Sequence, residues 1–425
     1  MYNRSWPASM SHIISRREFG GLVAVVGAQG GRLLGATDGA GKIDDTLRSG
    51  SAQRKIPAAV GMAVGESGIL YSGAFGTRDS TGPPVNADAI FSIASMTKPI
   101  TTVAALQLVE QGKLTLDEPV SKYLPQLGTL EVLEGFDADG KPRLRPARTP
   151  VTLKHLLTHT SGICYDIWEP EMFRYASQAK GGVPDPPPLM FEPGTRWQYG
   201  MGVDWAGRLI EKLSGMNLEE YFQARILGPL DMRDTSYLIP ASKFDRLVSS
   251  YARQADGSLQ QNPRVAPRAP KEFGGGGGLY STAGDYVKFM QMILRKGRGP
   301  NHDRILQAKT VESMETNQIG TATAGKMKSY RPNLSSDVDM QPGATEKWGL
   351  GFLINTTAYD GGRSDGSLAW AGLFNTFFWI DPKRSLCAVL MMQFLPFVDK
   401  DAVGLLGDFE RAVYGSLRPS AAGRT

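Results

Sequence analysis

Residues 91–101 read Phe91-Ser92-Ile93-Ala94-Ser95-Met96-Thr97-Lys98-Pro99-Ile100-Thr101. Ser95 and Lys98 lie three residues apart, and on a helix this spacing puts both side chains on one face. Because proline is tolerated only in the first turn of a helix, Pro99 predicts a helix that begins near Ser95. The apolar pattern that follows is helical as far as residue 111, and Gly112 is a natural C-terminal stop.

This spacing makes Ser95 a candidate nucleophile and Lys98 its candidate base. A serine hydroxyl is a poor nucleophile until a base takes its proton, and a buried lysine can supply that base. The spacing by itself has little specificity, since Ser177 and Lys180 repeat it. That second pair runs into a loop rich in glycine and proline and opens no apolar helix, so we interpret it as accidental.

A second serine motif, Gly362-Arg363-Ser364-Asp365-Gly366, matches the nucleophile elbow of a different hydrolase fold. That fold needs a strand before the serine and a catalytic histidine after it in the sequence. Here the preceding segment is polar, and all four histidines precede Ser364. We therefore interpret this motif as a glycine-rich turn.

Strands are predicted near both ends of the chain and helices in the middle. The strand patterns cover residues 57–64, 69–75, 368–380 and 385–393, and helical patterns cover 207–213, 218–227, 283–295 and 399–414. Residues 113–150 and 180–195 are predicted to be loops. We therefore predict an α+β fold: residues 41–125 and 265–425 form an α/β domain, residues 126–264 form a mostly helical domain, and residues 1–40 are a leader or a disordered segment.

The composition is that of an ordinary globular protein. Of the 425 residues, 41% are hydrophobic and 21% charged, and a formal net charge of +5 is too small to indicate nucleic-acid binding. The two cysteines lie outside any Cys-x-x-Cys pair or Cys/His cluster, so no metal site is expected. No apolar stretch reaches the length of about 18 residues that a membrane span needs.

The N-terminal segment contains a pattern that bears on localisation. Arg16-Arg17 precedes the apolar stretch Leu22-Val23-Ala24-Val25-Val26. This arrangement resembles the start of a bacterial twin-arginine export signal, which would place the protein in the periplasm or outside the cell. The alternative is a chance arginine pair in a disordered tail, and the protein would then be cytoplasmic.

The run around Ser95 resembles the serine β-lactamase and penicillin-binding-protein superfamily. Four further runs resemble the same superfamily in the expected order: Leu114-Thr115-Leu116-Asp117-Glu118-Pro119-Val120, His155-Leu156-Leu157-Thr158-His159-Thr160-Ser161-Gly162, Phe191-Glu192-Pro193-Gly194 and Gly276-Gly277-Gly278-Leu279-Tyr280-Ser281-Thr282. The likeness is greatest to the class C β-lactamase-like esterases, the family VIII carboxylesterases. It implies a β-lactamase/transpeptidase-like fold, with an antiparallel sheet flanked by helices and a mostly helical region.

The resemblance also assigns roles to residues far from the first motif. It implies that Tyr199 shares the proton transfer with Lys98. It places Trp370-Ala371-Gly372 on the strand that lines the substrate site, and it implies an oxyanion hole formed by the backbone N–H groups of Ser95 and Leu373. Glycine at position 372 would let that strand come close to the substrate.

Two departures from the β-lactamase pattern point to neutral substrates. Met201 stands where those enzymes hold the amide of a β-lactam with an asparagine, and Trp370 stands where they pair its carboxylate with a cation. We therefore predict a serine esterase that hydrolyses short-chain carboxylic esters through an acyl-enzyme on Ser95, with β-lactam hydrolysis as a weak side activity. The alternatives are a β-lactamase or D-alanyl-peptide hydrolase, an acyltransferase, and a catalytically silent penicillin-recognising protein. The expected partner is a small-molecule ester, no cofactor or metal is implied, and the oligomeric state is left open.

Two further features are interpreted as structural. His155 and His159 lie, by the resemblance, on a structural helix, and we expect them to make core hydrogen bonds rather than to act on substrate. The five glycines at positions 274–278 lack the Gly-Lys-Ser/Thr ending of a phosphate loop, so they predict a tight passage of the backbone.

Overall fold

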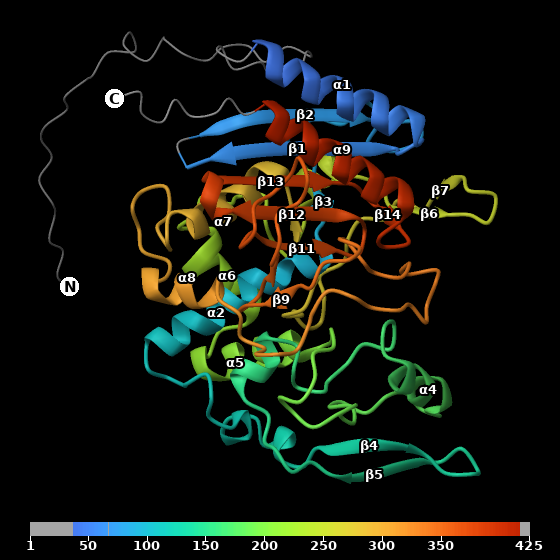
Figure 1. Cartoon of the computed structure of the whole chain (residues 1–425), viewed down its shortest axis with the longest axis vertical. Helices are drawn as coiled ribbons and strands as arrows, with labels where there is room; N and C mark the ends of the chain where they lie inside the picture. Colours follow the sequence, from blue (N-terminus) through green and yellow to red (C-terminus); the bar gives the residue numbers. More distant parts are fainter. Residues whose placement is uncertain (1–36, 67, 417–425) are drawn as a thin grey trace, which may run out of the picture.

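A seven-stranded sheet occupies the upper half of the molecule as drawn in Figure 1. The computed structural model describes residues 37–66 and 68–416. The strands lie in the order β2-β1-β13-β12-β11-β10-β9, and each pairs antiparallel with its neighbours. Their bounds are β1 Ala58–Gly65, β2 Ile69–Gly76, β9 Lys347–Trp348, β10 Leu353–Ile354, β11 Leu368–Gly372, β12 Thr376–Asp381 and β13 Leu386–Met391. The predicted α+β fold, with one antiparallel sheet built from both ends of the chain, is confirmed.

Helices cover both faces of this sheet. On β12, Trp379 packs against Phe409 of α9 (Lys400–Ser416), whereas its neighbour Phe378 packs against Tyr286 of α7 (Ala283–Leu294). Consecutive residues of a strand point to opposite faces, so α9 and α7 lie on opposite sides. Every residue of β1, β12 and β13 is buried, which explains why these strands read as continuous apolar runs.

Helix α1 (Thr37–Gln53) packs beside α9 over the same face of the sheet (Figure 1). It begins inside the segment 1–40 that was predicted to be a leader or disordered, so that boundary is wrong at its C-terminal end. The reason is tertiary: Ile43 and Leu47 are buried, and a helix with so few apolar residues gives little signal in the sequence. The Arg16-Arg17 pair and residues 22–26 lie outside the described residues.

Helix α2 (Thr97–Glu110) follows a short 3₁₀ turn at Ala94–Met96, in agreement with the predicted start near Ser95. Residues 97–106 are all buried, and the main packing partner of α2 is helix α5 (Gly202–Ser214). A helix that is buried all round needs no polar face, and its sequence is accordingly almost uncharged.

The segment 126–264 is less helical than predicted. It holds α3 (Leu153–Leu157), α4 (Pro170–Gln178), α5 and α6 (Leu218–Phe222), but also two β-hairpins, β4 (Glu131–Phe136) with β5 (Pro142–Pro146) and β6 (Tyr251–Arg253) with β7 (Leu259–Gln261). The first hairpin lies within residues 113–150, which were predicted to be a loop. Its second strand is short, polar and half-exposed, so it lacks the apolar alternation that identifies a strand. The remaining elements are β3 (Phe91–Ser92), β8 (Tyr280–Ser281), α8 (Ala308–Met314) and β14 (Phe394–Leu395).

The strand predicted over 368–380 is two strands, β11 and β12, that are joined by a turn at residues 373–375. Asn375 has a φ of +63°, its N–H donates to the Gly372 carbonyl, and its side chain donates to the carbonyls of Phe394 and Pro396. Asparagine tolerates this left-handed conformation better than most residues, which allows the tight reversal. Leu373 therefore lies in a turn at the end of β11.

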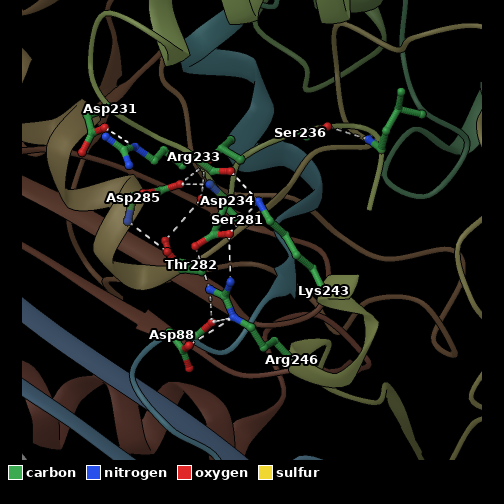
Figure 2. Close-up of polar contacts among 12 residues, drawn as sticks. Asp88, Asp231, Arg233, Asp234, Ser236, Lys243, Arg246, Ser281, Thr282 and Asp285 are labelled. Atoms are coloured by element: carbon green, nitrogen blue, oxygen red, sulfur yellow. Dashed lines mark hydrogen bonds and ion pairs between the residues drawn. The ribbon is translucent and has the colours of Figure 1, made fainter. Parts of the chain in front are cut away.

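A polar network braces the strand pair that leads to Ser95 (Figure 2). β3 pairs with β8, and Ser281 of β8 shares a hydrogen bond of 2.7 Å with Thr235. The Asp285 carboxylate accepts bonds from the N–H and hydroxyl of the segment at 234–235. Arg246 and Lys243 bind the Asp234 carboxylate at 2.7–2.9 Å. The network thus anchors the chain just before the candidate nucleophile.

Candidate active site

Ser95 and Lys98 are brought together as their spacing predicts. The Lys98 Nζ lies 3.2 Å from the Ser95 Oγ, and the lysine is only 1% exposed. Ala94, directly before the serine, has a φ of +42°, a conformation that L-residues seldom adopt. Such strain persists only where the surrounding structure enforces it, and here it sets the direction in which Ser95 leaves β3.

Two further acceptors surround the Lys98 ammonium group. The Gly276 carbonyl accepts a hydrogen bond of 2.7 Å, and the hydroxyl of Tyr165 accepts one of 3.2 Å. The nitrogen also lies 4.8 Å from the ring centre of Tyr199. Oxygen atoms of Ser95, Gly276 and Tyr165 therefore surround the Lys98 nitrogen, which fixes the side chain against Ser95.

Tyr199 lies beside Lys98, but it faces the lysine nitrogen with its ring and not with its hydroxyl. The Tyr199 hydroxyl instead accepts a hydrogen bond of 3.1 Å from the indole N–H of Trp370. The phenol that is hydrogen-bonded to Lys98 belongs to Tyr165, which the sequence analysis did not select. Tyr165 lies in an irregular loop after the His-Thr-Ser-Gly run, and no local pattern marks it.

Tyr165 is linked in turn to a carboxylate. Its hydroxyl donates to the Asp204 Oδ2 over 3.4 Å, and the Asp204 Oδ1 accepts a bond of 2.9 Å from the Gly276 N–H. Burial and then the Asp204 charge raise the pKa of Tyr165 well above its usual value, so the phenol keeps its proton. Asp204 stands in the first turn of α5, a common place for an acidic residue, so sequence alone gives it no special status.

The glycine run forms the tight backbone passage that was predicted. A Cβ on Gly275 would lie 2.4 Å from the Val203 carbonyl oxygen, and one on Gly276 would lie 2.3 Å from the Asp204 Oδ2. The Thr101 hydroxyl donates to the Gly275 carbonyl. Only residues without a side chain let this segment pass between α2 and α5 and present a carbonyl to Lys98.

The end of β11 lies against the nucleophile turn. A Cβ on Gly372 would lie 2.3 Å from the Ile93 carbonyl oxygen, so glycine is required for this approach. Among the hydrogen bonds of the described residues, none is donated by the N–H of Ser95 or of Leu373. These are the two groups predicted to form the oxyanion hole, and that role stays a prediction. Ala371 and Trp370 are largely buried in β11, and their predicted substrate contacts are likewise untested.

The two histidines of the His-x-x-x-His run make structural hydrogen bonds. His155 accepts a bond from the Thr152 N–H at the start of α3, and the His159 Nδ1 accepts one from the Gly200 N–H. Burial, and then the charge of Lys98, lower the pKa of His159 well below its usual value, so the imidazole is neutral. His159 packs against the ring of Tyr199, with centres 4.6 Å apart, and so supports that tyrosine.

A cavity of about 1110 Å³ opens next to these groups. Tyr165, Asp204 and Met201 are among its lining residues, whereas Ser95 and Lys98 are not, so the cavity is connected to the candidate nucleophile through Tyr165. Its volume is slightly above the range of about 300–1,000 Å³ that is typical of small-molecule sites in proteins. In the described part of the chain no group of three or more His, Cys, Asp or Glu side chains is placed to bind a metal, and no helix there is long and apolar enough to cross a membrane.

The two other candidate serines, Ser177 and Ser364, make contacts that include no basic side chain. The Ser177 hydroxyl donates to the Phe173 carbonyl within α4. Ser364 lies in the turn before β11, where its N–H donates to Asp381. Both positions agree with the interpretation that these motifs are accidental.

Comparison with known proteins gives a consistent result. A family model described as Beta-lactamase matches residues 43–409. The chain is 34% identical over 400 residues to the monacolin J acid methylbutanoyltransferase of Aspergillus terreus, covering 88% of this chain and 96% of that protein. It is 33% identical over 399 residues to the lovastatin esterase of Penicillium rubens, covering 88% and 98%. The unliganded simvastatin synthase of Aspergillus terreus has a TM-score of 0.78 at 32% identity, covering 91% of this chain and 100% of that one.

These relatives are fungal and carry both acyltransferase and esterase names, so they do not single out the bacterial family VIII carboxylesterases that the sequence suggested. They agree with the matched family model and with the fold on the larger grouping. The chain belongs to the β-lactamase family, within the superfamily of β-lactamase and transpeptidase-like serine hydrolases.

Proposed function

We propose that this protein is a serine acyltransferase that forms an acyl-enzyme on Ser95 and passes the acyl group to the hydroxyl of an organic acceptor. The observation that carries the proposal is the 3.2 Å contact between the Lys98 Nζ and the Ser95 Oγ. A nucleophile with a neighbouring base can be acylated. A cavity of about 1110 Å³, which is lined by the Tyr165 that binds Lys98, supports the proposal because it has room for an acceptor as well as a donor.

The chemistry needs two balanced steps. The Ser95 Oγ attacks the acyl carbonyl of an ester or thioester donor, its proton passes through Lys98 to the leaving group, and the bond from the acyl carbon to that group breaks. The hydroxyl oxygen of the acceptor then attacks the acyl carbon, its proton returns through Lys98 to the Ser95 oxygen, and a new ester leaves. The N–H groups of Ser95 and Leu373 would hold the oxyanion in both steps. Tyr199, next to Lys98, would support the proton transfers.

Transfer is favoured over hydrolysis as the main activity by the relatives. The methylbutanoyltransferase of Aspergillus terreus matches nearly the full length of its chain at 34% identity. Ester hydrolysis is the second candidate, because the lovastatin esterase of Penicillium rubens matches almost as well. The two activities share the acyl-enzyme and differ only in whether water or an alcohol attacks it.

A two-stage experiment tests this proposal. In the first stage, a fluorophosphonate probe is applied to the wild-type protein and to the Ser95→Ala and Ser364→Ala variants. We expect labelling of the wild type and of Ser364→Ala and its loss in Ser95→Ala. Labelling that survives in Ser95→Ala, or no labelling of the folded wild type, contradicts the proposed nucleophile and favours a silent binding protein.

In the second stage, the turnover of p-nitrophenyl butyrate is measured at increasing concentrations of a secondary alcohol. A separate assay measures the opening of a cephalosporin without the ester. We expect the alcohol to capture most of the butyryl group as a new ester and thereby to reduce the yield of free butyrate. Butyrate as the sole product at every alcohol concentration would identify an esterase. Fast opening of the cephalosporin with negligible ester turnover would identify a β-lactamase.

A further inference from the structure

We propose that Tyr165 and Asp204 are positioning residues that hold Lys98 in place against Ser95. The inference rests on the proposed function, since it assumes that Ser95 is acylated with the help of Lys98. It adds two residues that neither the sequence motifs nor the resemblance assigned.

Four groups form a closed ring of hydrogen bonds. The Lys98 Nζ donates to the Tyr165 hydroxyl over 3.2 Å, and that hydroxyl donates to the Asp204 Oδ2 over 3.4 Å. The Asp204 Oδ1 accepts a bond of 2.9 Å from the Gly276 N–H, and the Gly276 carbonyl accepts one of 2.7 Å from the same Lys98 Nζ. Each member contacts two others, so the position of the lysine is determined from two sides.

The direction of each bond in the ring follows from which atoms can donate and which can accept. A carboxylate has only acceptors, so the Tyr165 hydroxyl must donate to Asp204 and accept from an N–H of Lys98. Because Tyr165 keeps its proton, it can serve both partners at once. The negative charge of Asp204 therefore acts on Lys98 through a single phenol, although the two charged groups do not form an ion pair.

The ring of hydrogen bonds requires a glycine at position 276. A Cβ there would lie 2.3 Å from the Asp204 Oδ2, so any other residue would displace the carboxylate or the backbone. This gives one glycine of the run at 274–278 a purpose beyond close packing. It lets one peptide unit bind Asp204 with its N–H and Lys98 with its carbonyl group.

The two tyrosines beside Lys98 thus have different surroundings. The Tyr199 hydroxyl is bound to Trp370, whereas the Tyr165 hydroxyl is bound to Lys98 and Asp204. Tyr165 and Asp204 also line the cavity, so the ring separates Lys98 from it.

The experiment measures the rate of fluorophosphonate labelling against pH for the wild type, for Tyr165→Phe and Asp204→Asn, and for the double variant that combines them. Tyr237→Phe is the matched control, because it removes a phenol that donates to the Gly274 carbonyl of the same glycine run. Thermal melting of every variant separates misplacement of Lys98 from unfolding. The charged and titratable groups around Lys98 are Tyr165, Tyr199, His159 and Asp204.

We expect the labelling rate of Tyr165→Phe and Asp204→Asn at the pH optimum to fall about ten- to a hundredfold, as small misplacements of catalytic groups do. The double variant should lose little more than either single variant, because both substitutions break the same chain of hydrogen bonds to Lys98. The Tyr237→Phe control should keep the rate.

Two results would overturn the inference while leaving the proposed function intact. One is wild-type labelling rates in both folded variants. The other is a double variant in which the two losses multiply, or an equal loss in Tyr237→Phe, either of which would show a merely structural role. If instead the wild type is not labelled at Ser95, the proposed function itself fails.

Discussion

The indole N–H of Trp370 donates a hydrogen bond of 3.1 Å to the hydroxyl oxygen of Tyr199. Trp370 is fixed in β11 and packs edge-on against Trp348, with ring centres 4.7 Å apart. The strand that lies against the nucleophile turn therefore also fixes the phenol that stands over Lys98. Trp370, which was expected to contact substrate, instead forms a hydrogen bond with the candidate catalytic residue Tyr199.

Replacing Trp370 by phenylalanine tests this contact. The Trp370→Phe variant keeps an aromatic ring in β11 but removes the N–H, so the Tyr199 hydroxyl loses its donor. A hydrogen bond of this kind contributes about 1 kcal/mol, and we expect kcat/KM for an ester substrate to fall about five- to tenfold.

Trp379→Phe is the matched control for that experiment. Trp379 is also a buried tryptophan of the sheet, and its indole N–H donates to the Tyr414 hydroxyl on the face away from α7. The Trp379→Phe variant should be less stable than the wild type but should have the wild-type kcat/KM per folded molecule. Equal losses of kcat/KM in the two variants would show that the Trp370 contact has no special part in the reaction.

The local part of the site could be predicted from the sequence, and the tertiary part could not. Ser95 and Lys98 are three residues apart, and Pro99 fixes the start of their helix, so their contact follows from helix geometry alone. Tyr165 and Gly276 meet Lys98 across separations of 67 and 178 residues. No periodicity connects residues so far apart, and each is of a type that is common in loops.

The sheet shows the same division. Strands that are buried on both faces were found from their apolar runs, whereas the turn between β11 and β12 was missed. Residues 368–380 are mostly apolar, and Gly372 and Asn375 are the only turn-forming residues among them. The reversal at Asn375 depends on carbonyl groups of a later segment, Phe394 and Pro396, so the local signal alone was too weak to predict it.

Asp234 should make the protein sensitive to acid. Hydrogen bonds from Arg246, and further contact with Lys243, lower the pKa of Asp234 to about 2 (Figure 2). A carboxyl whose pKa is lower in the folded state stabilises the fold above its unfolded pKa, and this contribution is lost as the pH falls from about 4 to 2. Because the carboxylate is partly exposed, we expect Asp234→Asn to reduce the free energy of unfolding by about 1 to 2 kcal/mol at pH 6.

Urea unfolding at pH 6 and pH 3 measures this effect. The difference between Asp234→Asn and the wild type should be smaller at pH 3, where the carboxyl is largely protonated in the unfolded chain but mostly ionised in the fold. Asp139→Asn is the control, since that side chain is exposed in the turn between β4 and β5. A difference that is the same at both pH values would mean that Asp234 acts through packing rather than charge.

Glu346 should have the opposite effect. It is 4% exposed, and burial raises its pKa to about 7. The folded protein therefore binds a proton at pH values where the unfolded chain has released it, so stability falls as the pH rises from about 4.5 to 7 and stays lower above that. We expect Glu346→Gln, which is neutral at every pH, to be more stable than the wild type by about 2 kcal/mol at pH 8.

The measurement is again urea unfolding, at pH 8 and at pH 4.5. The advantage of Glu346→Gln should shrink towards zero at pH 4.5, where the wild-type side chain is also neutral. A variant that is less stable than the wild type at pH 8 would show that the Glu346 carboxylate is ionised and well paired in the fold.

The charge of the cavity should select the acceptor. Its lining has more carboxylates than cations: Asp166, Asp185, Asp204, Glu211 and Glu272 against Arg208 and Lys271. The Arg208 guanidinium is 2.6 Å from Asp185, so it is already paired. Burial, and then the Glu272 charge, raise the pKa of Glu211, which indicates that these two acids repel each other. An acceptor that carries a carboxylate would add to this repulsion, whereas a neutral alcohol would not.

A hydroxy acid and its methyl ester provide a matched pair of acceptors, because they differ in one charge at nearly the same size. With a butyryl ester as donor, we expect the methyl ester to accept the acyl group about tenfold faster, which corresponds to about 1.4 kcal/mol. The preference should weaken as salt rises, since screening acts on partly exposed charges. It should also weaken in Glu272→Gln, which removes one of the two repelling acids. A preference for the free acid would show that a cation in the cavity receives the carboxylate. A preference for the methyl ester that neither salt nor this substitution changes would show that charge does not select the acceptor.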